Sequence, residues 1–440
     1  METFTLKSFF RFVKITIGCI AVTCATSAWT VNSEADKLPI LYFQPNTTPL
    51  FNDLYKAYGL SPLPQKTFFD EAIYLDQSTP ETILPMQPSN QFVFGEANDV
   101  LSEYHKKIGD FELYADPSKP KPFFYTASGS KHLIVALVYA IATSEPQKKF
   151  VFAEQAPYYS GHPNAVSGIF TYPNARFLAF HDPAEIVLEP GEELVEFVTS
   201  PNNPDGKFRK PLTNAQTIIA DFVFASSAFG LGETGYREAN IEWIRQARAA
   251  GKHVFSFNSA SKQFGKTGCR CGYIWYPLHD AYAEKIFKKF FGFISASTVA
   301  GSSVGLAHFL DLIKALLEAS ENGEALRQDA KKSLQIRHNL LTKEFQQRYP
   351  GSIILSIPGS PTFFVKVADK RIPGKRASDI LLEDLHISVN SGESMGENAE
   401  FIRLNLCGQS QPFVELLNRL AKEKKYSDKD ILVLAPAFSH

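Results

Sequence analysis

A lysine, a serine and an arginine lie close together in one segment of this sequence. Ser259 stands three residues before Lys262, and Arg270 stands eight residues after it. A lysine amine can form a Schiff base with a carbonyl compound, and a hydroxyl and a guanidinium can bind a phosphate through charge-assisted hydrogen bonds. These residue types at this spacing therefore predict a site for a carbonyl cofactor that carries a phosphate. The structural alternative is a surface loop whose basic residues are solvated.

The same segment contains Gly265-Lys266-Thr267, which resembles part of a nucleotide-binding phosphate loop. That motif needs a further glycine five positions before its second glycine, and this chain has Ala260 there. The nucleotide interpretation therefore fails. The glycines of the segment instead let the backbone turn tightly.

Three more polar side chains lie at the ends of apolar stretches, or inside them, where strands are predicted. Asn203 lies in an Asn-Pro-Asp-Gly turn after one stretch, Asp221 ends another over 217–220, and Arg403 stands inside a third over 401–406. A guanidinium inside an apolar strand needs an anion, which a substrate carboxylate or an internal salt bridge could supply. An ordinary turn and a surface aspartate are the structural alternatives for the other two.

A helix predicted over residues 131–143 follows Gly129 and Ser130, with Lys131 in its first turn. Backbone N–H groups at a helix N-terminus favour an anion, although an ordinary helix cap has the same appearance. This helix end is therefore a second candidate for the phosphate contact.

Together these motifs resemble the fold-type I pyridoxal 5'-phosphate (PLP) enzymes, and they are most similar to the alliinase and plant tryptophan aminotransferase branch. The lysine segment matches that family's pattern of Ser-x-Ser-Lys, two glycines and Arg-x-Gly at every position. The resemblance implies that Lys262 holds PLP as a Schiff base, that Asn203 hydrogen-bonds its phenolic oxygen, and that Asp221 pairs with its protonated pyridine nitrogen. That ion pair would let the ring accept electrons released at the substrate's Cα.

The resemblance also implies the remaining contacts. The other side chains expected around the cofactor are Gly129, Ser130, Lys131, Tyr159, Ser259 and Arg270, with Tyr158 as the second choice for the ring that stacks on the pyridine. Arg403, with Asn203, would bind the substrate's α-carboxylate. Two positions depart from the family: Lys131 replaces a common threonine, and Phe224 replaces a tyrosine that donates to the phenolic oxygen. One hydrogen bond to the cofactor would therefore be absent.

The elements around these motifs predict an α/β fold. Continuous apolar runs alternate with helices from about residue 123 to 275, which indicates a mostly parallel sheet covered by helices on both faces. Long helical stretches over 304–319 and 324–347 then lead into a smaller C-terminal α/β domain. We therefore predict a large PLP-binding domain over residues 96–322, and a bridging helix with a small domain over 323–440.

The N-terminal part differs from the rest. Three basic residues precede an uncharged stretch over 15–28, which predicts a secretory signal peptide over residues 1–28. The stretch is shorter than the roughly 20 residues that span a bilayer, which favours cleavage over an uncleaved anchor. The polar, proline-rich residues 29–95 predict an extended arm without a long helix. The mature protein is expected to be secreted or periplasmic.

Composition excludes several other classes. The 440 residues are 44% hydrophobic and 21% charged, with a formal net charge of -1, as in ordinary globular proteins. No charge excess attracts the chain to nucleic acid or to an anionic membrane. Cys269, Cys271 and Cys407 are too few for a disulfide framework, and no suitably spaced histidines make them a metal site. They are predicted to be buried thiols.

The resemblance implies an aminotransferase that moves the α-amino group of an L-amino acid, an aromatic one being a candidate, to a 2-oxo acid. A carbon–sulfur lyase acting on S-substituted cysteine derivatives, as alliinase does, would use the same machinery. The sequence shows no cysteine-rich segment such as plant alliinases carry before the catalytic domain, so we expect transamination. A PLP-binding protein without turnover is the third alternative, motivated by Phe224 and Lys131. A homodimer is also implied, with each subunit closing the other's pocket.

Overall fold

The structure is a computed structural model that describes residues 40–43, 50–58, 95–115, 124–168, 172–275, 281–298, 303–372, 374–422 and 425–432. The chain divides into two units, Met1–Ile40 and Leu41–His440, and every element described here belongs to the second. The predicted signal peptide over residues 1–28 lies outside the described residues, as does most of the predicted arm over 29–95.

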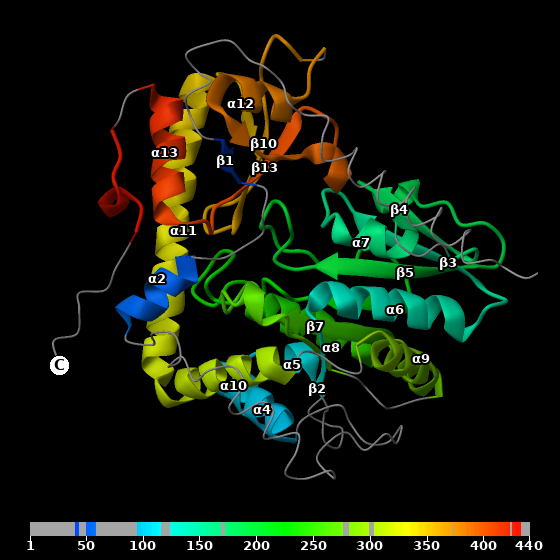
Figure 1. Cartoon of the computed structure of the whole chain (residues 1–440). Helices are drawn as coiled ribbons and strands as arrows, with labels where there is room; N and C mark the ends of the chain where they lie inside the picture. Colours follow the sequence, from blue (N-terminus) through cyan, green and yellow to red (C-terminus); the bar gives the residue numbers. More distant parts are fainter. Residues whose placement is uncertain are drawn as a thin grey trace, which may run out of the picture. The chain divides into compact units, whose positions relative to one another are not determined.

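A seven-stranded sheet forms the larger layer (Figure 1). Its strands, in order across the sheet, are β2 (Phe124–Ala127), β8 (Gly272–Trp275), β7 (His253–Ser259), β6 (Thr217–Asp221), β5 (Glu192–Thr199), β3 (Lys149–Gln155) and β4 (Ala175–Phe180). β8 is antiparallel to both neighbours, and all other neighbouring pairs are parallel. The predicted mostly parallel sheet is confirmed, and the C-terminal ends of six strands meet the start of β8 at one edge.

Helices cover both faces of this sheet. α6 (Ser130–Ser144) and α9 (Ala281–Thr298) pack on one face, and the other is covered by α4 (Gly95–Ile108), α5 (Phe111–Tyr114), α8 (Arg237–Ala249) and α10 (Ser303–Glu318). Both faces are covered because the strands carry apolar side chains on both sides. In β6, Ile218 packs into the core on the α8 side and Ile219 packs into the core on the α6 side. Since side chains alternate along a strand, Asp221 projects to the α6 side.

A second, four-stranded antiparallel sheet follows in the chain. Its order is β12 (Asn390–Ser391), β13 (Phe401–Asn405), β10 (Thr362–Lys366) and β9 (Ile353–Ile354), and it is accompanied by α12 (Ala377–Leu385) and α13 (Ser410–Ala421). The two sheets lie within the ranges predicted for the large and small domains. The boundary itself, placed between residues 322 and 323, stays a prediction and falls inside a helix.

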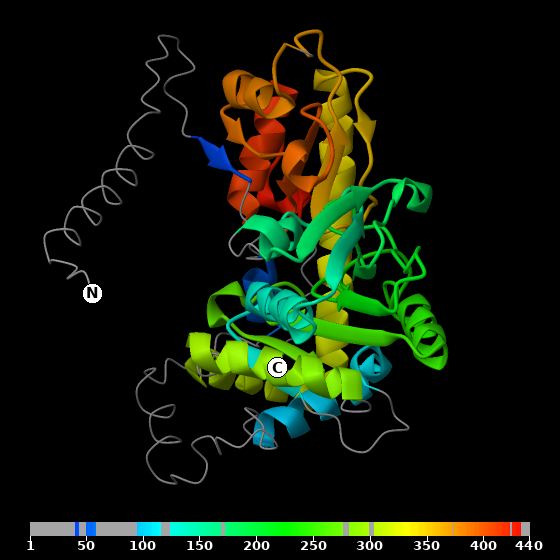
Figure 2. The ribbon, with the colours of Figure 1, turned by 90° about the vertical axis from the view of Figure 1, so that its right-hand side faces the viewer.

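That helix, α11 (Ser320–Arg348), is 29 residues long and runs along both layers, as its yellow ribbon shows in Figure 2. Arg337 in its middle is fully buried, and its guanidinium donates to the carbonyl oxygens of Leu406 at 2.8 Å and Gly408 at 2.7 Å. These carbonyls lie one and three residues after the end of β13. The bridging helix therefore fixes the end of the strand that carries Arg403.

The arm contains short elements that the sequence did not predict. β1 (Leu41–Tyr42) pairs in parallel with β11 (Ile387–Ser388), and α2 (Leu50–Ala57) buries Leu50, Phe51, Leu54 and Tyr55. Eight residues make only about two turns, too few for a clear helical period. Tyr55 donates to the carbonyl oxygen of Phe264 at 2.8 Å, next to the lysine segment. Among the described residues, no helix has the length and apolar character that crossing a membrane requires.

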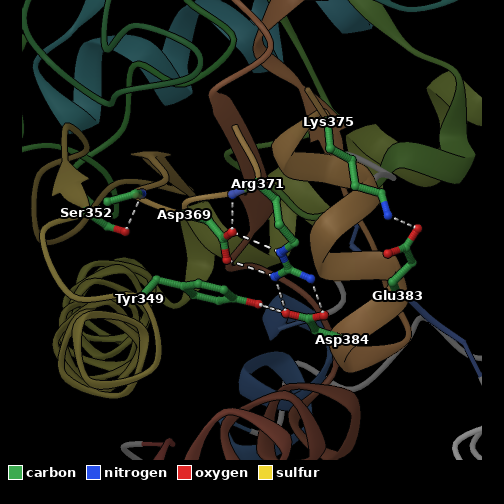
Figure 3. A network of polar contacts seen from close by, with 8 residues as sticks. Tyr349, Ser352, Asp369, Arg371, Lys375, Glu383 and Asp384 are labelled. Atoms are coloured by element: carbon green, nitrogen blue, oxygen red, sulfur yellow. Dashed lines mark hydrogen bonds and ion pairs between the residues drawn. The ribbon is translucent and has the colours of Figure 1, made fainter. Parts of the chain in front are cut away.

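Arg371 connects three parts of the smaller layer (Figure 3). Its guanidinium donates to both carboxylate oxygens of Asp369 and to both of Asp384, at 2.6 to 2.9 Å. Asp384 belongs to α12 and also accepts a hydrogen bond from Tyr349, at the end of α11, at 3.3 Å. The loop after β10 is thereby fixed to both helices.

Replacing Asp369 by asparagine should make the stability of the protein less sensitive to acid. Hydrogen bonds from Arg371 hold the pKa of Asp369 at about 2, below its ordinary value of about 3.9. A depressed carboxyl pKa contributes stability that is present above the unfolded-state pKa and is lost as the pH falls through the folded-state pKa. Because Arg371 is partly exposed, solvent screening limits the contribution to about 1 kcal/mol.

Urea unfolding of the wild type and Asp369→Asn, near neutral pH and again at about pH 2 to 3, measures this effect. The wild type should be more stable near neutrality, and the difference should shrink across the acid range. A difference that stays constant with pH would contradict the role of Asp369.

Candidate active site

The C-terminal edge of the seven-stranded sheet gathers the predicted cofactor residues. Following the strands in chain order, the edge carries Gly129 after β2, Tyr159 after β3, Asn203 after β5, Asp221 at the end of β6 and Lys262 after β7. Because β8 runs in the opposite direction, Arg270 and Gly272 at its start lie at the same edge. Open α/β sheets bind their ligands at this edge.

Lys262 lies in the turn after β7, and its side chain is half-buried. Burial has the largest effect on its amine and lowers the pKa to about 8; Arg403 and Arg270 lower this pKa further, and Asp221 raises it in part. The amine is therefore close enough to these three side chains for their charges to act on it. More of the amine is therefore unprotonated near neutral pH than for an ordinary lysine.

Asp221 is buried at the end of β6, with 4% of its surface exposed. Its Oδ1 accepts a hydrogen bond from the backbone N–H of Val223 at 2.9 Å, and its Oδ2 lies 3.4 Å from Nε2 of His162. A buried carboxylate needs a cationic or hydrogen-bonding partner on each oxygen. The carboxylate is thus oriented at the sheet edge, where a protonated ring nitrogen could make a further contact.

His162 and Glu154 belong to this site, although the sequence did not predict them. Glu154 Oε2 lies 2.7 Å from Nδ1 of His162, and their exposed fractions are 3% and 0%. Burial alone would lower the pKa of the imidazole, but Glu154 and Asp221 outweigh it and raise this pKa to about 9. Burial also raises the pKa of the Glu154 carboxyl, and His162 and Thr199 partly offset this effect. The raised pKa of His162 favours the imidazolium form beside the two acidic side chains. The available signal was an acid inside a buried strand, where Glu is rare unless it is paired.

Gly129, Arg270 and Gly272 form a tightly packed cradle at the N-terminus of α6. Gly129 has a φ of 93°, and a Cβ added to it would lie 2.6 Å from Nη2 of Arg270. A Cβ on Gly272 would lie 2.6 Å from the backbone carbon of Gly129 and 2.8 Å from the backbone nitrogen of Ser130. Arg270 also donates to the carbonyl oxygen of Ser128 at 3.0 Å. The guanidinium and the helix N-terminus lie side by side, a combination suited to a phosphate.

The other predicted phosphate contacts have different surroundings. Ser259 is fully buried, and its Oγ lies 2.9 Å from both the Oγ of Ser261 and the carbonyl oxygen of Cys271. Its hydroxyl therefore braces the loop between β7 and β8. Ser130 is half-buried and Lys131 is exposed in the first turn of α6. The phosphate contacts of these three residues stay predictions.

Tyr159 is the aromatic candidate that lies among the charged site residues. Burial raises the pKa of its hydroxyl, as does Asp221, while Arg403 and Arg270 act in the opposite direction. A Cβ on Gly161 would lie only 2.2 Å from the Tyr159 ring. Only glycine at position 161 therefore permits this position of the ring.

Tyr158 has a different role. Its backbone N–H donates to the carbonyl oxygen of Met395 at 3.0 Å, in η5 (Gly392–Met395) beside the smaller sheet. Its ring packs edge-on against Phe177 with centroids 5.2 Å apart, and a Cβ on Gly396 would lie 2.4 Å from the ring. Tyr158 thus joins the two layers and leaves Tyr159 as the better candidate for stacking.

Arg403 also joins the two layers. Its Nη1 donates to Oδ1 of Asn203 at 3.1 Å, and its Nη2 donates to Oδ1 of Asn390 at 3.0 Å. Burial lowers the pKa of the guanidinium to about 10, an effect that Tyr159 partly offsets. The two amides orient the guanidinium without neutralising its charge, as a carboxylate-binding arginine requires. Asn390 was not predicted, because β12 is too short to be recognised.

One departure from the expected pattern and three thiols remain to be placed. Phe224 is buried and packs edge-on against Phe229, with ring centroids 5.5 Å apart, so the loss of a hydrogen bond to the cofactor stays a prediction. Cys271 and Cys407 are buried thiols, whereas Cys269 is only half-buried. Burial raises the pKa of Cys407 to about 12, so this neighbour of Lys262 stays neutral.

These residues fit a phosphate-bearing carbonyl cofactor with a basic ring nitrogen. The glycine cradle beside Arg270 suits the phosphate, the Lys262 amine suits the carbonyl, and Asp221 suits the ring nitrogen. Within the described residues, no group of three or more His, Cys, Asp or Glu side chains is arranged to hold a metal ion.

The chain is similar to known proteins over most of its length. The family model described as Allinase matches residues 84–424. Tryptophan aminotransferase-related protein 3 of Arabidopsis thaliana is 22% identical over 359 residues, which cover 78% of this chain and 71% of that protein.

Two solved structures show the fold. An aspartate aminotransferase double mutant of Thermus thermophilus has a TM-score of 0.60 and 16% identity, covering 96% of this chain and all of that one. An aromatic aminotransferase of Pyrococcus horikoshii has a TM-score of 0.61 and 15% identity, covering 89% and 96% of the two chains. The predicted fold class, that of the fold-type I aminotransferases, is confirmed.

PLP added to the protein should attach to Lys262 with a rate that rises with pH around a midpoint near 8. Only the unprotonated amine attacks a carbonyl, and burial of Lys262 places its pKa there. Borohydride reduction followed by peptide mass spectrometry would measure the attachment at each pH. Lys288, which is 64% exposed, is the internal reference, and preferential labelling of Lys288 would refute the assignment.

Gly272→Ala should weaken PLP binding by about tenfold or more, because its methyl group would collide with the backbone of Gly129 and Ser130. Gly268→Ala is the matched control, since a Cβ there meets nothing within 4 Å in the same loop. Fluorescence titration with PLP gives both dissociation constants, and thermal melting reports any general loss of stability. Equal PLP affinities in the two variants would show that the cradle does not hold the cofactor.

Proposed function

Since the chain belongs to the alliinase family, we propose that it is a PLP-dependent aminotransferase that transfers the α-amino group of an L-amino acid to a 2-oxo acid. The observation that carries this proposal is the position of Lys262, Asp221 and Arg270 at one edge of the larger sheet, where Asn203 accepts a hydrogen bond from Arg403. These are the groups that a PLP aminotransferase needs for its covalent anchor, its two anions and its ring nitrogen.

The chain's own residues divide the work. PLP would supply an electron-accepting ring conjugated to the substrate's Cα. Arg270 and the backbone around Gly129 would hold its phosphate, while Asp221 would keep its ring nitrogen protonated. Lys262, with a pKa near 8, is suited to anchor the cofactor and then to remove and return a proton at Cα.

The substrate would be held between the two sheets. Arg403 presents an oriented, buried guanidinium, which matches the α-carboxylate of an amino acid. Asn203 contacts this guanidinium from the larger layer. The position of the substrate's carboxylate relative to the cofactor would therefore be fixed. Tyr159 would cover the ring face, with Gly161 giving it room.

The description of the matching family, Allinase, supports a second candidate function. A carbon–sulfur lyase would use the same residues, with a sulfur leaving group expelled from Cβ after the proton is removed from Cα. The name of the Arabidopsis relative and the overall likeness to aminotransferases support transamination instead. The aromatic amino acid expected as a candidate substrate, the homodimer and the secreted or periplasmic location remain proposals.

Purified protein with PLP should form a new amino acid from a 2-oxo acid when offered aromatic, acidic or aliphatic L-amino acids. Arg403→Lys should lower kcat/KM for these donors by about a hundredfold, because a bidentate, charge-assisted contact worth about 2 to 3 kcal/mol is lost. Lys262→Ala should abolish transfer. Chromatography of the products over time measures the activity.

The same assay separates the alternatives. Pyruvate released from an S-substituted cysteine sulfoxide without any 2-oxo acid would identify a lyase and overturn the proposal. PLP binding without either product, and without exchange of the α-proton in deuterated water, would identify a non-catalytic protein.

A further inference from the structure

We propose that Glu154 is a positioning residue of this site, which keeps His162 cationic so that His162 orients Asp221 toward the ring nitrogen of PLP. The inference rests on the proposed function, because it concerns a contact to bound PLP. It goes further by giving a role to a carboxylate that lies behind the cofactor contacts.

Three neighbouring strands build this unit. Glu154 lies on β3, Thr199 on β5 and Asp221 on β6, and β5 lies between the other two strands. Thr199 donates from Oγ1 to Oε1 of Glu154 at 3.1 Å, and Nδ1 of His162 lies 2.7 Å from Oε2. Both oxygens of Glu154 are therefore engaged, and its side chain has one defined orientation.

The imidazole is held equally firmly. Its ring stacks on Phe197 with centroids 4.4 Å apart and an angle of 7°, and it meets the Tyr159 ring edge-on at 5.3 Å. With the ring plane fixed and Nδ1 beside Glu154, Nε2 lies 3.4 Å from Oδ2 of Asp221. This is an ion-pair distance at which the two atoms form no hydrogen bond. Tyr159 is predicted to stack on the cofactor ring and Asp221 to pair with its nitrogen. Both side chains therefore contact the same imidazole.

The charges explain why Glu154 is needed. Burial favours the neutral form of an imidazole, and one carboxylate would have to overcome this cost alone. The titratable groups that face His162 are Glu154 from β3, Asp221 from β6 and Tyr159 from the segment before α7 (Gly161–Pro163). Two carboxylates and one imidazolium leave one buried negative charge, which a protonated ring nitrogen would neutralise. The raised pKa of His162 agrees with this balance.

Glu154→Gln tests the coupling with almost no change in volume. Glu196 provides a matched control, because it is equally buried on the adjacent β5, where its carboxylate accepts hydrogen bonds from Leu212 and Thr213. In protein without PLP, NMR of isotope-labelled histidine gives the titration midpoint of His162, with His162→Asn identifying its signal. The midpoint should fall by at least about one unit in Glu154→Gln and stay unchanged in Glu196→Gln.

Cofactor binding provides the second readout. Glu154→Gln should raise the dissociation constant for PLP about tenfold, since the bracing of Asp221 is weakened, whereas Glu196→Gln should match the wild type. The pH dependence of the visible absorbance of bound PLP should also differ between the two variants. A purely structural role for Glu154 would change thermal stability and leave the absorbance profile unchanged.

The outcomes are distinct. An unchanged His162 midpoint in Glu154→Gln, or equal PLP affinity in both variants, would overturn the inference. If Glu154→Gln does not fold, Thr199→Val replaces it, because losing the hydroxyl that holds Glu154 should lower the midpoint by a smaller amount, and no shift would again overturn the inference. A wild type that ignores PLP would refute the proposed function, whereas the inference alone fails if the wild type binds PLP and Glu154→Gln binds it equally well.

Discussion

The hydrogen bond between Arg403 and Asn203 joins the two sheets at the place where cofactor and substrate would meet. The two residues are 200 positions apart in the chain, and other cross-layer contacts surround their bond. These contacts run from Tyr158 to Met395, from Thr362 to Pro204, from Ile357 to Asp205 and from Gly230 to Gly359. Because they involve several separate turns, the two layers are held in one arrangement, and the geometry of the site depends on it.

The electrostatics of the site have one common cause. Burial lowers the pKa of both the Lys262 amine and the Arg403 guanidinium, so two cations are held in an interior that favours their neutral forms. An anion that enters such a space gains a stronger interaction than it would in water. For Arg403 the proposed anion is the substrate's α-carboxylate, whereas for Lys262 the neutral amine is the form that bonds the carbonyl of the cofactor. Burial therefore suits both residues to their proposed partners.

Sequence reasoning singled out residues that carry a local signature. Lys262 follows a buried strand and Asp221 ends one, and the structure places both at the common edge where parallel strands end. Their roles stay predictions. Glu154 and His162 could not be predicted, since their pairing depends on how β3, β5 and β6 lie next to one another. Gly161 was missed for a similar reason. Its lack of a side chain leaves space for the Tyr159 ring, and only the folded structure shows that the two residues are in contact. The short α2 offered too few turns to establish a period.

The reversed strand β8 makes the segment from Ser259 to Gly272 a hairpin-like connection between neighbouring strands. Lys262 and Arg270 therefore come together through contacts that are local in the chain, which form with a small loss of loop entropy. Arg403 reaches the same place only by long-range closure. During synthesis the ribosome completes every predicted cofactor contact, from Gly129 to Arg270, before it adds Arg403. The order of translation thus places the means of holding the cofactor ahead of the means of selecting a substrate.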